Sequence, residues 1–208
     1  MNKITFIIPT IGRNTLINSL QSLISQDNPN WYAIVIFDGV SKNVTSNIII
    51  DDERITYLYI DKKVGVSNHA GNVRNFGIKH SKTEWCGFLD DDDCLTPNYV
   101  SLFYDTIENY KEVEVIQWRM KVKGQYVPGA TGEIKVCNIG ISQSIKTAIL
   151  LEYPFEPSWC EDYNLLNRLK NANKKIIISD NVTYLVRNEK KSNFPKFTKR
   201  FYNFQPSA

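Results

Sequence analysis

The sequence predicts an α/β protein with a mostly parallel central sheet flanked by helices. Three continuous apolar, β-rich runs lack polar alternation, over Ile4–Ile8, Tyr32–Phe37 and Trp85–Leu89. Runs of this kind are typical of strands buried on both faces of a sheet. Helical spacing of apolar residues lies between them, and a strand–helix–strand order predicts parallel pairing. At 208 residues and 42% hydrophobic, the chain is long enough for one sizeable core.

The first strand and helix are delimited by local breakers. Pro9 begins the Pro-Thr-Ile-Gly stretch that ends the first strand. Apolar residues at helical spacing predict a helix over 16–24, which Asn14 or Thr15 would cap. The second strand ends at Asp38-Gly39, so two strands and a helix form one βαβ unit.

The later elements follow by the same criteria, and residues 41–53 are left unplaced. In the first half we expect a strand over Ile55–Ile60, a helix from about His69 to His80 and the strand at Trp85. In the second half we expect helices over Asn98–Tyr110 and Gln143–Leu150 and one beginning at Glu161, with strands over Val113–Met120, Glu133–Ile141, Ile176–Ser179 and Val182–Val186.

Four consecutive carboxylates, Asp90 to Asp93, follow the apolar run that begins at Trp85. Like charges this close repel one another unless a cation or water receives them. Hard cations such as Mg²⁺ and Mn²⁺ take oxygen ligands. The alternative is an acidic turn or helix start, where Asp is favoured by capping and by the helix dipole.

Five motifs in order resemble those of the family 2 glycosyltransferases, which have the GT-A fold. They are Ile-Pro-Thr at 8–10, Asp38-Gly39, Arg-Asn-Phe-Gly at 74–77, the run Phe88 to Asp93, and Glu-Asp-Tyr at 161–163. Together they extend over about residues 3 to 190. The resemblance implies an inverting transfer of sugar from a nucleotide-sugar, usually a UDP-sugar, to a glycan or other hydroxyl acceptor.

The resemblance also implies residues for the donor. Pro9 and Thr10 would line the nucleoside end, and Asp38 would accept hydrogen bonds from the base. Arg74 and Arg187 would meet the diphosphate, for which a planar, always charged guanidinium is suited. The alternatives are an Asp-Gly turn at Asp38 and an exposed helix arginine at Arg74.

The aspartate run would carry the metal. The resemblance aligns its D-x-D element with Asp90 and Asp91 near the ribose and Asp92 on Mn²⁺ or Mg²⁺, with the register open by one residue. Asp93 would either cap the following helix or support the metal ligands. The family often has a His after the Arg near its last strand, and none follows Arg187 here, so the remaining ligand is undefined.

The catalytic pair implied by the resemblance is Asp162 as general base and Glu161 as a hydrogen-bonding partner of the sugar or acceptor. The aromatic loop before them would exclude water and raise the basicity of Asp162. The alternative is that both are first-turn helix acids. Trp159, Tyr153 and Phe155 are candidates to stack on a sugar, against ordinary loop packing.

The predicted organisation is one domain over residues 1–190, with a nucleotide-sugar half at 1–97 and an acceptor half at 98–190. The net charge of +3 is too mild to indicate nucleic acid, and four scattered cysteines with two histidines favour free thiols over a zinc site. Without a spanning or signal segment we expect a cytoplasmic protein. The basic, aromatic tail at 191–208 would pack on protein, fold back or contact another subunit, or lie on a membrane surface.

Two other functions compete with glycosyl transfer. A catalytically inactive glycosyltransferase-like domain would bind a glycan or a partner enzyme, and the absent His favours it. A sugar nucleotidyltransferase would share nucleotide binding at strand ends, but it would need a Gly-rich, basic phosphate loop. The stretch from Pro9 to Arg13 matches such a loop poorly. The sequence does not define the sugar or the acceptor.

Overall fold

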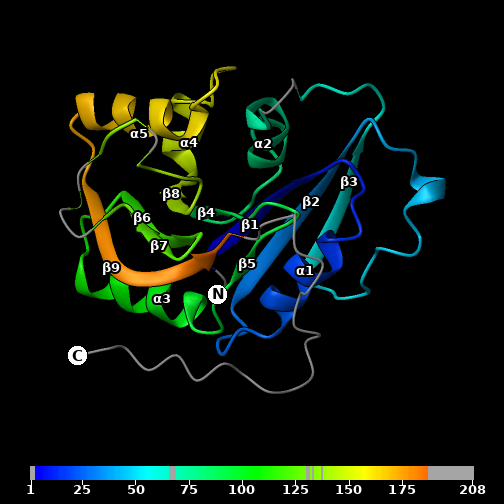
Figure 1. The fold of residues 1–208 in the computed structure, drawn as a ribbon, viewed down its shortest axis with the longest axis horizontal. Helices are drawn as coiled ribbons and strands as arrows, with labels where there is room; N and C mark the ends of the chain where they lie inside the picture. The colour runs from blue at the N-terminus through cyan, green and yellow to red at the C-terminus, as the bar shows by residue number, and fades with distance from the viewer. Residues whose placement is uncertain (1–2, 66–68, 130–131, 133, 137, 187–208) are drawn as a thin grey trace.

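The structure is a computed structural model, and it describes residues 3–65, 69–129, 132, 134–136 and 138–186. One mixed sheet runs through both predicted halves of the chain, in the order β3-β2-β1-β4-β8-β6-β9-β5, with β7 paired to β6 (Figure 1). The predicted α/β class is therefore confirmed.

The first four strands of this order are parallel, as the βαβ pattern predicts. They are β1 (Ile4–Thr10), β2 (Trp31–Asp38), β3 (Ile55–Ile60) and β4 (Trp85–Phe88). All seven residues of β1 are buried because β2 and β4 flank it and helices cover both faces of the sheet. Because both faces of β1 are buried, its sequence does not alternate between polar and apolar residues.

The rest of the sheet mixes directions. It comprises β5 (Cys94–Leu95), β6 (Val115–Val122), β7 (Gln125–Val127), β8 (Gln143–Lys146) and β9 (Ile176–Leu185). β8 is antiparallel to both β4 and β6, whereas β9 is parallel to β6. The long, curved β9 reaches from β6 to the short β5, which brings its carboxyl end close to the aspartate run (Figure 1).

Helices cover both faces of the sheet. In Figure 1, α1 (Leu16–Ile24) and α3 (Tyr99–Asn109) lie below it, and α2 (Gly71–Ile78), α4 (Thr147–Glu152) and α5 (Glu161–Asn171) lie above. A single 3₁₀ turn, Lys42–Val44, lies in the segment that the sequence left unplaced. No helix in the described part of the chain is long and apolar enough to cross a membrane.

Several predicted elements are wrong. The described residues of 133–141 form no strand, and Gln143–Lys146 is strand β8 rather than the start of a helix, which begins only at Thr147. The two strands predicted in 176–186 are one continuous β9. Thr15 occupies the cap position of α1 without a capping hydrogen bond from its side chain.

Candidate active site

The candidate site lies at the carboxyl ends of the parallel strands, where ligands bind in open α/β sheets. Thr10 ends β1, Asp38 ends β2, and Asp90 follows β4 by two residues. Because the three strands are adjacent and parallel, these polar residues share one edge of the sheet. The sequence placed each of these residues at or just after the end of a predicted strand, and the parallel order of the strands brings them together.

Asp91 is the most enclosed of the first three aspartates, with a side chain 7% exposed. Its Oδ2 accepts a hydrogen bond from Thr10 Oγ1 at 2.6 Å, and its Oδ1 lies 3.2 Å from Arg13 Nη1. Burial raises the pKa of this carboxyl, although the Thr10 hydroxyl and Arg13 act in the opposite direction. Asp91 thus ties the end of β4 to the loop after β1.

Arg13 also lies beside Asp92, with Nη1 3.0 Å from Asp92 Oδ2. Arg13 is not among the site residues predicted from the sequence, because a single arginine after a loop carries no periodic signal. Its position in the loop three residues after the end of β1, at the edge of the sheet that carries the aspartates, is the signal that could have found it.

Arg74 joins two carboxylates from distant parts of the chain. Its Nη2 lies 2.5 Å from Asp90 Oδ1, and its Nη1 donates to Glu161 Oε1. The Arg74 side chain is only 5% exposed, so the predicted alternative of an exposed helix arginine is wrong. Burial would lower the pKa of the guanidinium, but Asp90 and Glu161 raise it overall, so Arg74 is a fixed cation of the site.

Glu161 lies at the start of α5 and faces the start of α2. Its Oε1 accepts the amide N–H of Ala70 at 3.2 Å, and its Oε2 accepts that of Gly71 at 2.7 Å. Both carboxylate oxygens thus accept backbone amides at the start of α2, and Oε1 also accepts from the Arg74 side chain. The predicted contact of Glu161 with sugar or acceptor stays a prediction.

Asp162 follows Glu161 and has a raised pKa. Burial is the largest cause, and the nearby charges of Glu161 and Asp90 add to it, whereas the Tyr163 amide and Arg74 lower the pKa. Asp162 Oδ1 accepts that amide at 2.8 Å. A desolvated carboxylate is a stronger base than one in water, which is the property predicted for Asp162 from the sequence.

Asp38 is buried, and both oxygens accept backbone amides. Val64 N lies 2.7 Å from Oδ1, and Gly65 N lies 2.9 Å from Oδ2. A Cβ added at Gly65 would lie 2.7 Å from Asp38 Oδ2, so a glycine is required for this approach. Asp38 holds the loop after β3 against the end of β2, and a role toward a base stays a prediction.

The residues fit a hard divalent cation in chemistry and exposure. Asp90 and Asp92 are partly exposed, at 34% and 23%, whereas Asp91 is enclosed. Mg²⁺ is usually bound through one or two protein carboxylates, with waters and substrate phosphates completing its shell. Among the described residues no three His, Cys, Asp or Glu side chains are grouped to hold a metal ion, so phosphate oxygens would have to contribute.

The remaining predicted residues differ in their surroundings. Pro9 is buried within β1, and Trp159 is 76% exposed. Tyr153 lies under Lys174 Nζ, 5.5 Å from its ring centre. Phe155 is 2% exposed and packs edge-on against Phe88, so it serves the loop-packing alternative. Arg187 lies outside the described residues, as does the tail.

Two further residues support the site, Tyr184 and the Asn75 of the Arg-Asn-Phe-Gly motif. The sequence did not indicate their contacts. The hydroxyl oxygen of Tyr184, near the end of β9, accepts the amide N–H of Asp90 at 3.0 Å. Asn75 exchanges two hydrogen bonds with the backbone of Phe155, at 2.8 and 2.9 Å. Contacts of this kind depend on tertiary docking and leave no local pattern.

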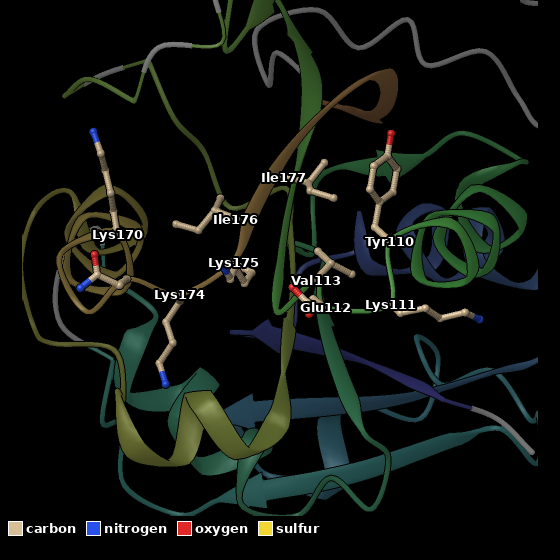
Figure 2. Close-up of a pocket in the computed structure, with 10 residues that line it drawn as sticks. Tyr110, Lys111, Glu112, Val113, Lys170, Lys174, Lys175, Ile176 and Ile177 are labelled. Atoms are coloured by element: carbon tan, nitrogen blue, oxygen red, sulfur yellow. The ribbon is translucent and has the colours of Figure 1, made fainter.

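A separate pocket of about 700 Å³ lies at the opposite end of the sheet, where β6 and β9 begin. Lys111, Lys170 and Lys174 line it, but their side chains point in different directions in Figure 2. Ammonium groups that diverge do not define one ligand, so we assign none to this pocket.

A comparison with models of protein families identifies the family of this chain. The model for "Glycosyl transferase family 2" matches residues 5–156. The chain belongs to this family. The matched range includes the first four of the five motifs, and it stops short of the fifth, at Glu161 and Asp162.

Relatives within the family are longer proteins. The chain is 34% identical over 119 residues to a GalNAc(5)-diNAcBac-PP-undecaprenol beta-1,3-glucosyltransferase of Campylobacter jejuni, covering 54% of this chain and 37% of the relative. It is 32% identical over 130 residues to an uncharacterised glycosyltransferase of Rickettsia bellii, covering 60% of this chain and 18% of the relative. The chain thus spans less than two fifths of either relative.

Solved structures show the GT-A fold. Residues 1–349 of S. aureus TarS, in complex with UDP-GlcNAc, match with a TM-score of 0.70 at 21% identity, over 91% of this chain and 60% of that one. The mannosyltransferase PcManGT of Pyrobaculum calidifontis, in complex with GDP-Man and Mn²⁺, matches with a TM-score of 0.66 at 17% identity, over 88% and 56%. The predicted family and fold are confirmed.

Proposed function

We propose that this chain transfers a sugar from a UDP-sugar to a hydroxyl group of a glycan acceptor, with inversion at the anomeric carbon. The observation that carries the proposal is the Arg74 fork. By bonding Asp90 with one arm and Glu161 with the other, Arg74 brings the candidate donor carboxylates and the candidate base Asp162 to one site. Donor and acceptor must meet at such a site for transfer to occur.

The donor assignment is supported by the family and by its solved structures. TarS was solved with UDP-GlcNAc and PcManGT with GDP-Man, so nucleotide-sugars bind this fold. We propose Asp38 and Thr10 for the nucleoside, Arg74 and Arg187 for the diphosphate, and Asp92 for a divalent cation. When bound, the cation stabilises the negative charge that develops on the departing diphosphate.

Asp162 acts as the base in the proposed reaction. The acceptor hydroxyl gives its proton to the Asp162 carboxylate while its oxygen forms a bond to the anomeric carbon. The bond between that carbon and the phosphate oxygen breaks, and its electron pair leaves with the nucleoside diphosphate. Desolvation of Asp162 favours this proton transfer, because a carboxylate whose pKa is raised binds the proton more tightly.

The acceptor is proposed from chemistry and from one relative. The Campylobacter jejuni relative is named for a glycan linked through a diphosphate to undecaprenol. We propose a glycan hydroxyl as the acceptor, with the exposed Trp159 and with Tyr153 as candidates to contact a sugar ring.

The test is a panel of UDP-sugars, with GDP-mannose as a contrast, supplied with Mn²⁺ and short glycan acceptors. We expect hydrolysis or transfer with at least one UDP-sugar, and an inverted anomeric configuration by NMR. Asp92→Ala and Asp162→Asn should each lower the rate at least about hundredfold. If UDP binds but Asp162→Asn has the rate of the wild type, the domain is a binding module or uses another base. If no nucleotide binds, the proposal is wrong.

A further inference from the structure

Glu161 supplies the cap that α2 lacks. Ala70, the residue before α2, offers no side-chain hydrogen bond to the helix start, and the first turn of α2 contains no acidic residue. The unpaired amides at a helix start need acceptors. The Glu161 carboxylate accepts those of Ala70 and Gly71 from across the site, although it lies 91 and 90 residues later in the chain.

The approach of Glu161 to α2 is close and depends on Gly71. A Cβ at position 71 would lie 2.5 Å from Glu161 Oε2 and 2.9 Å from Phe155 Cβ. The two hydrogen bonds between Asn75 and the Phe155 backbone join the same elements one turn later. The start of α5 and its preceding loop are therefore fixed to α2 at successive turns.

Arg74 extends this connection to the donor side. It lies one helical turn after Ala70 and is bonded to Glu161 on one side and to Asp90 on the other. A buried guanidinium between two carboxylates is held firmly, because a buried charge that loses its partner is strongly unfavourable. Any shift of Glu161 would move both Arg74 and the backbone to which Asp162 belongs.

We infer that Glu161 is a positioning residue: it caps α2 and holds Arg74, and so sets the placement of the base Asp162 relative to the donor carboxylate Asp90, without contacting substrate. The inference rests on the proposed function for the roles of Asp162 and Asp90. It differs from the sequence-based expectation, in which Glu161 bonds the sugar or acceptor. The two roles give opposite results with UDP, which carries no sugar.

The first test measures UDP binding with Mn²⁺ by calorimetry for the wild type, Glu161→Gln, Arg74→Lys and the double variant. A glutamine keeps the shape but turns an N–H donor toward Arg74 or the α2 amides. We expect Glu161→Gln to weaken UDP binding about tenfold and the double variant to lose much less than the product of the single losses, since the residues are coupled. Unchanged UDP affinity together with impaired transfer would mean that Glu161 contacts sugar or acceptor, and would overturn the inference.

The second test needs no ligand and is amide hydrogen exchange of the free protein. We expect exchange at Ala70 and Gly71 to be at least about tenfold faster in Glu161→Gln, because a charged acceptor is lost. The matched control is Glu156→Gln, which removes a carboxylate from the exposed ion pair with Arg168 at 3.0 Å. Equal exchange in the wild type and Glu161→Gln would refute the cap, whether or not the wild type binds UDP.

Discussion

At the residue scale, burial of the ionised Asp162 carboxylate lowers the stability of the folded protein, and the same burial gives the carboxylate the higher basicity that the proposed reaction needs. Its pKa is raised chiefly by burial, so the folded state binds a proton at Asp162 more tightly than the unfolded state. The contribution of this group to stability is therefore greatest at low pH and is lost as the pH rises through its folded pKa. The folded protein is therefore less stable with Asp162 ionised, the form that acts as a base, than with Asp162 protonated.

Asp162→Asn should separate these two effects. The amide retains Oδ1 as an acceptor for the Tyr163 amide and carries no buried charge. At neutral pH we expect a higher midpoint of thermal unfolding and loss of transfer. The measurement is a thermal melt paired with an activity assay at pH 5 and pH 7.5. A melting temperature lower than that of the wild type at pH 7.5 would contradict the claim that burial of the ionised Asp162 destabilises the folded protein.

The pH dependence of transfer gives a further prediction for the wild type. Activity requires ionised Asp162, so the rate should fall as the pH is lowered through a pKa above the ordinary value for aspartate. The groups that affect Asp162 are Arg74, which lowers the pKa, and Glu161 and Asp90, which raise it. A kcat profile with no acidic limb above the ordinary range of aspartate would show that another group is the base.

A substitution at Thr10 measures how much its hydrogen bond to the buried Asp91 contributes to the stability of the fold. Thr10→Val keeps the shape of the side chain and removes the hydroxyl that donates to Asp91 Oδ2 and accepts the Gly12 amide. Hydrogen bonds to charged groups contribute about 1.5–3 kcal/mol, so we expect urea unfolding to show a loss of about 2 kcal/mol. Thr5→Val, which breaks a neutral hydroxyl pair with Thr83 at 2.7 Å, is the control and should cost about 1 kcal/mol.

At the element scale, α2 presents a different residue of its motif to each neighbour. Arg74 faces the carboxylates, Asn75 holds the loop at Phe155, and Gly77 lies directly on the sheet. A Cβ at position 77 would lie 2.7 Å from Ile36 Cδ1 and 2.9 Å from Ile7 Cγ2. The glycine allows α2 to lie close enough for Arg74 to reach Asp90.

Gly77→Ala should therefore destabilise the protein even though alanine is the better helix former. Overpacking costs about 1–3 kcal/mol, against a gain of about 1 kcal/mol in helix propensity. We expect a net loss in free energy of unfolding together with weaker UDP binding. Gly129→Ala is the control, because no heavy atom lies within 4 Å of its added Cβ, and it should change stability by less than about 0.5 kcal/mol.

The β8 strand shows why sequence periodicity failed in the second half. Gln143 and Ser144 are fully buried in a central strand, which their polarity argues against. The Ser144 hydroxyl is bonded to Tyr99 Oη at 2.8 Å and to Trp118 Nε1 at 3.0 Å. Partners on α3 and β6 thus satisfy the Ser144 hydroxyl, which would otherwise disfavour burial, and no local pattern predicts such partners.

At the scale of the whole molecule, the sheet makes one site from two halves. β8 pairs with β4 and joins the predicted nucleotide-sugar half (1–97) to the predicted acceptor half (98–190), and β9 brings Tyr184 to the amide of Asp90. In the proposed reaction the donor and its cation lie on the first half and the base on the second. Activity should consequently depend on a cation that the protein holds only weakly by itself.

The cation prediction follows from the absence of a three-residue ligand cluster in the described part of the chain. We expect electron paramagnetic resonance to detect weak Mn²⁺ binding that tightens when UDP is added, because phosphate oxygens complete the coordination. Asp92→Asn should abolish the tightening, and the exposed acid Asp105, changed to Asn, should leave it intact. Equal Mn²⁺ affinity with and without UDP would contradict the proposed assembly.

Local sequence patterns are sufficient to predict the parallel β1–β4 framework and the polar strand ends at Thr10, Asp38 and Asp90. These features depend on the local periodicity of apolar residues and on the rule that the carboxyl ends of parallel strands lie at the same edge of the sheet. The partners of the charged groups, in contrast, become known only from the folded chain, in which Arg13 lies beside Asp91, and Arg74 between Asp90 and Glu161. Charge pairing between residues 16 to 87 positions apart is set by how the elements dock, and docking depends on the shape of the whole core rather than on any short stretch of chain.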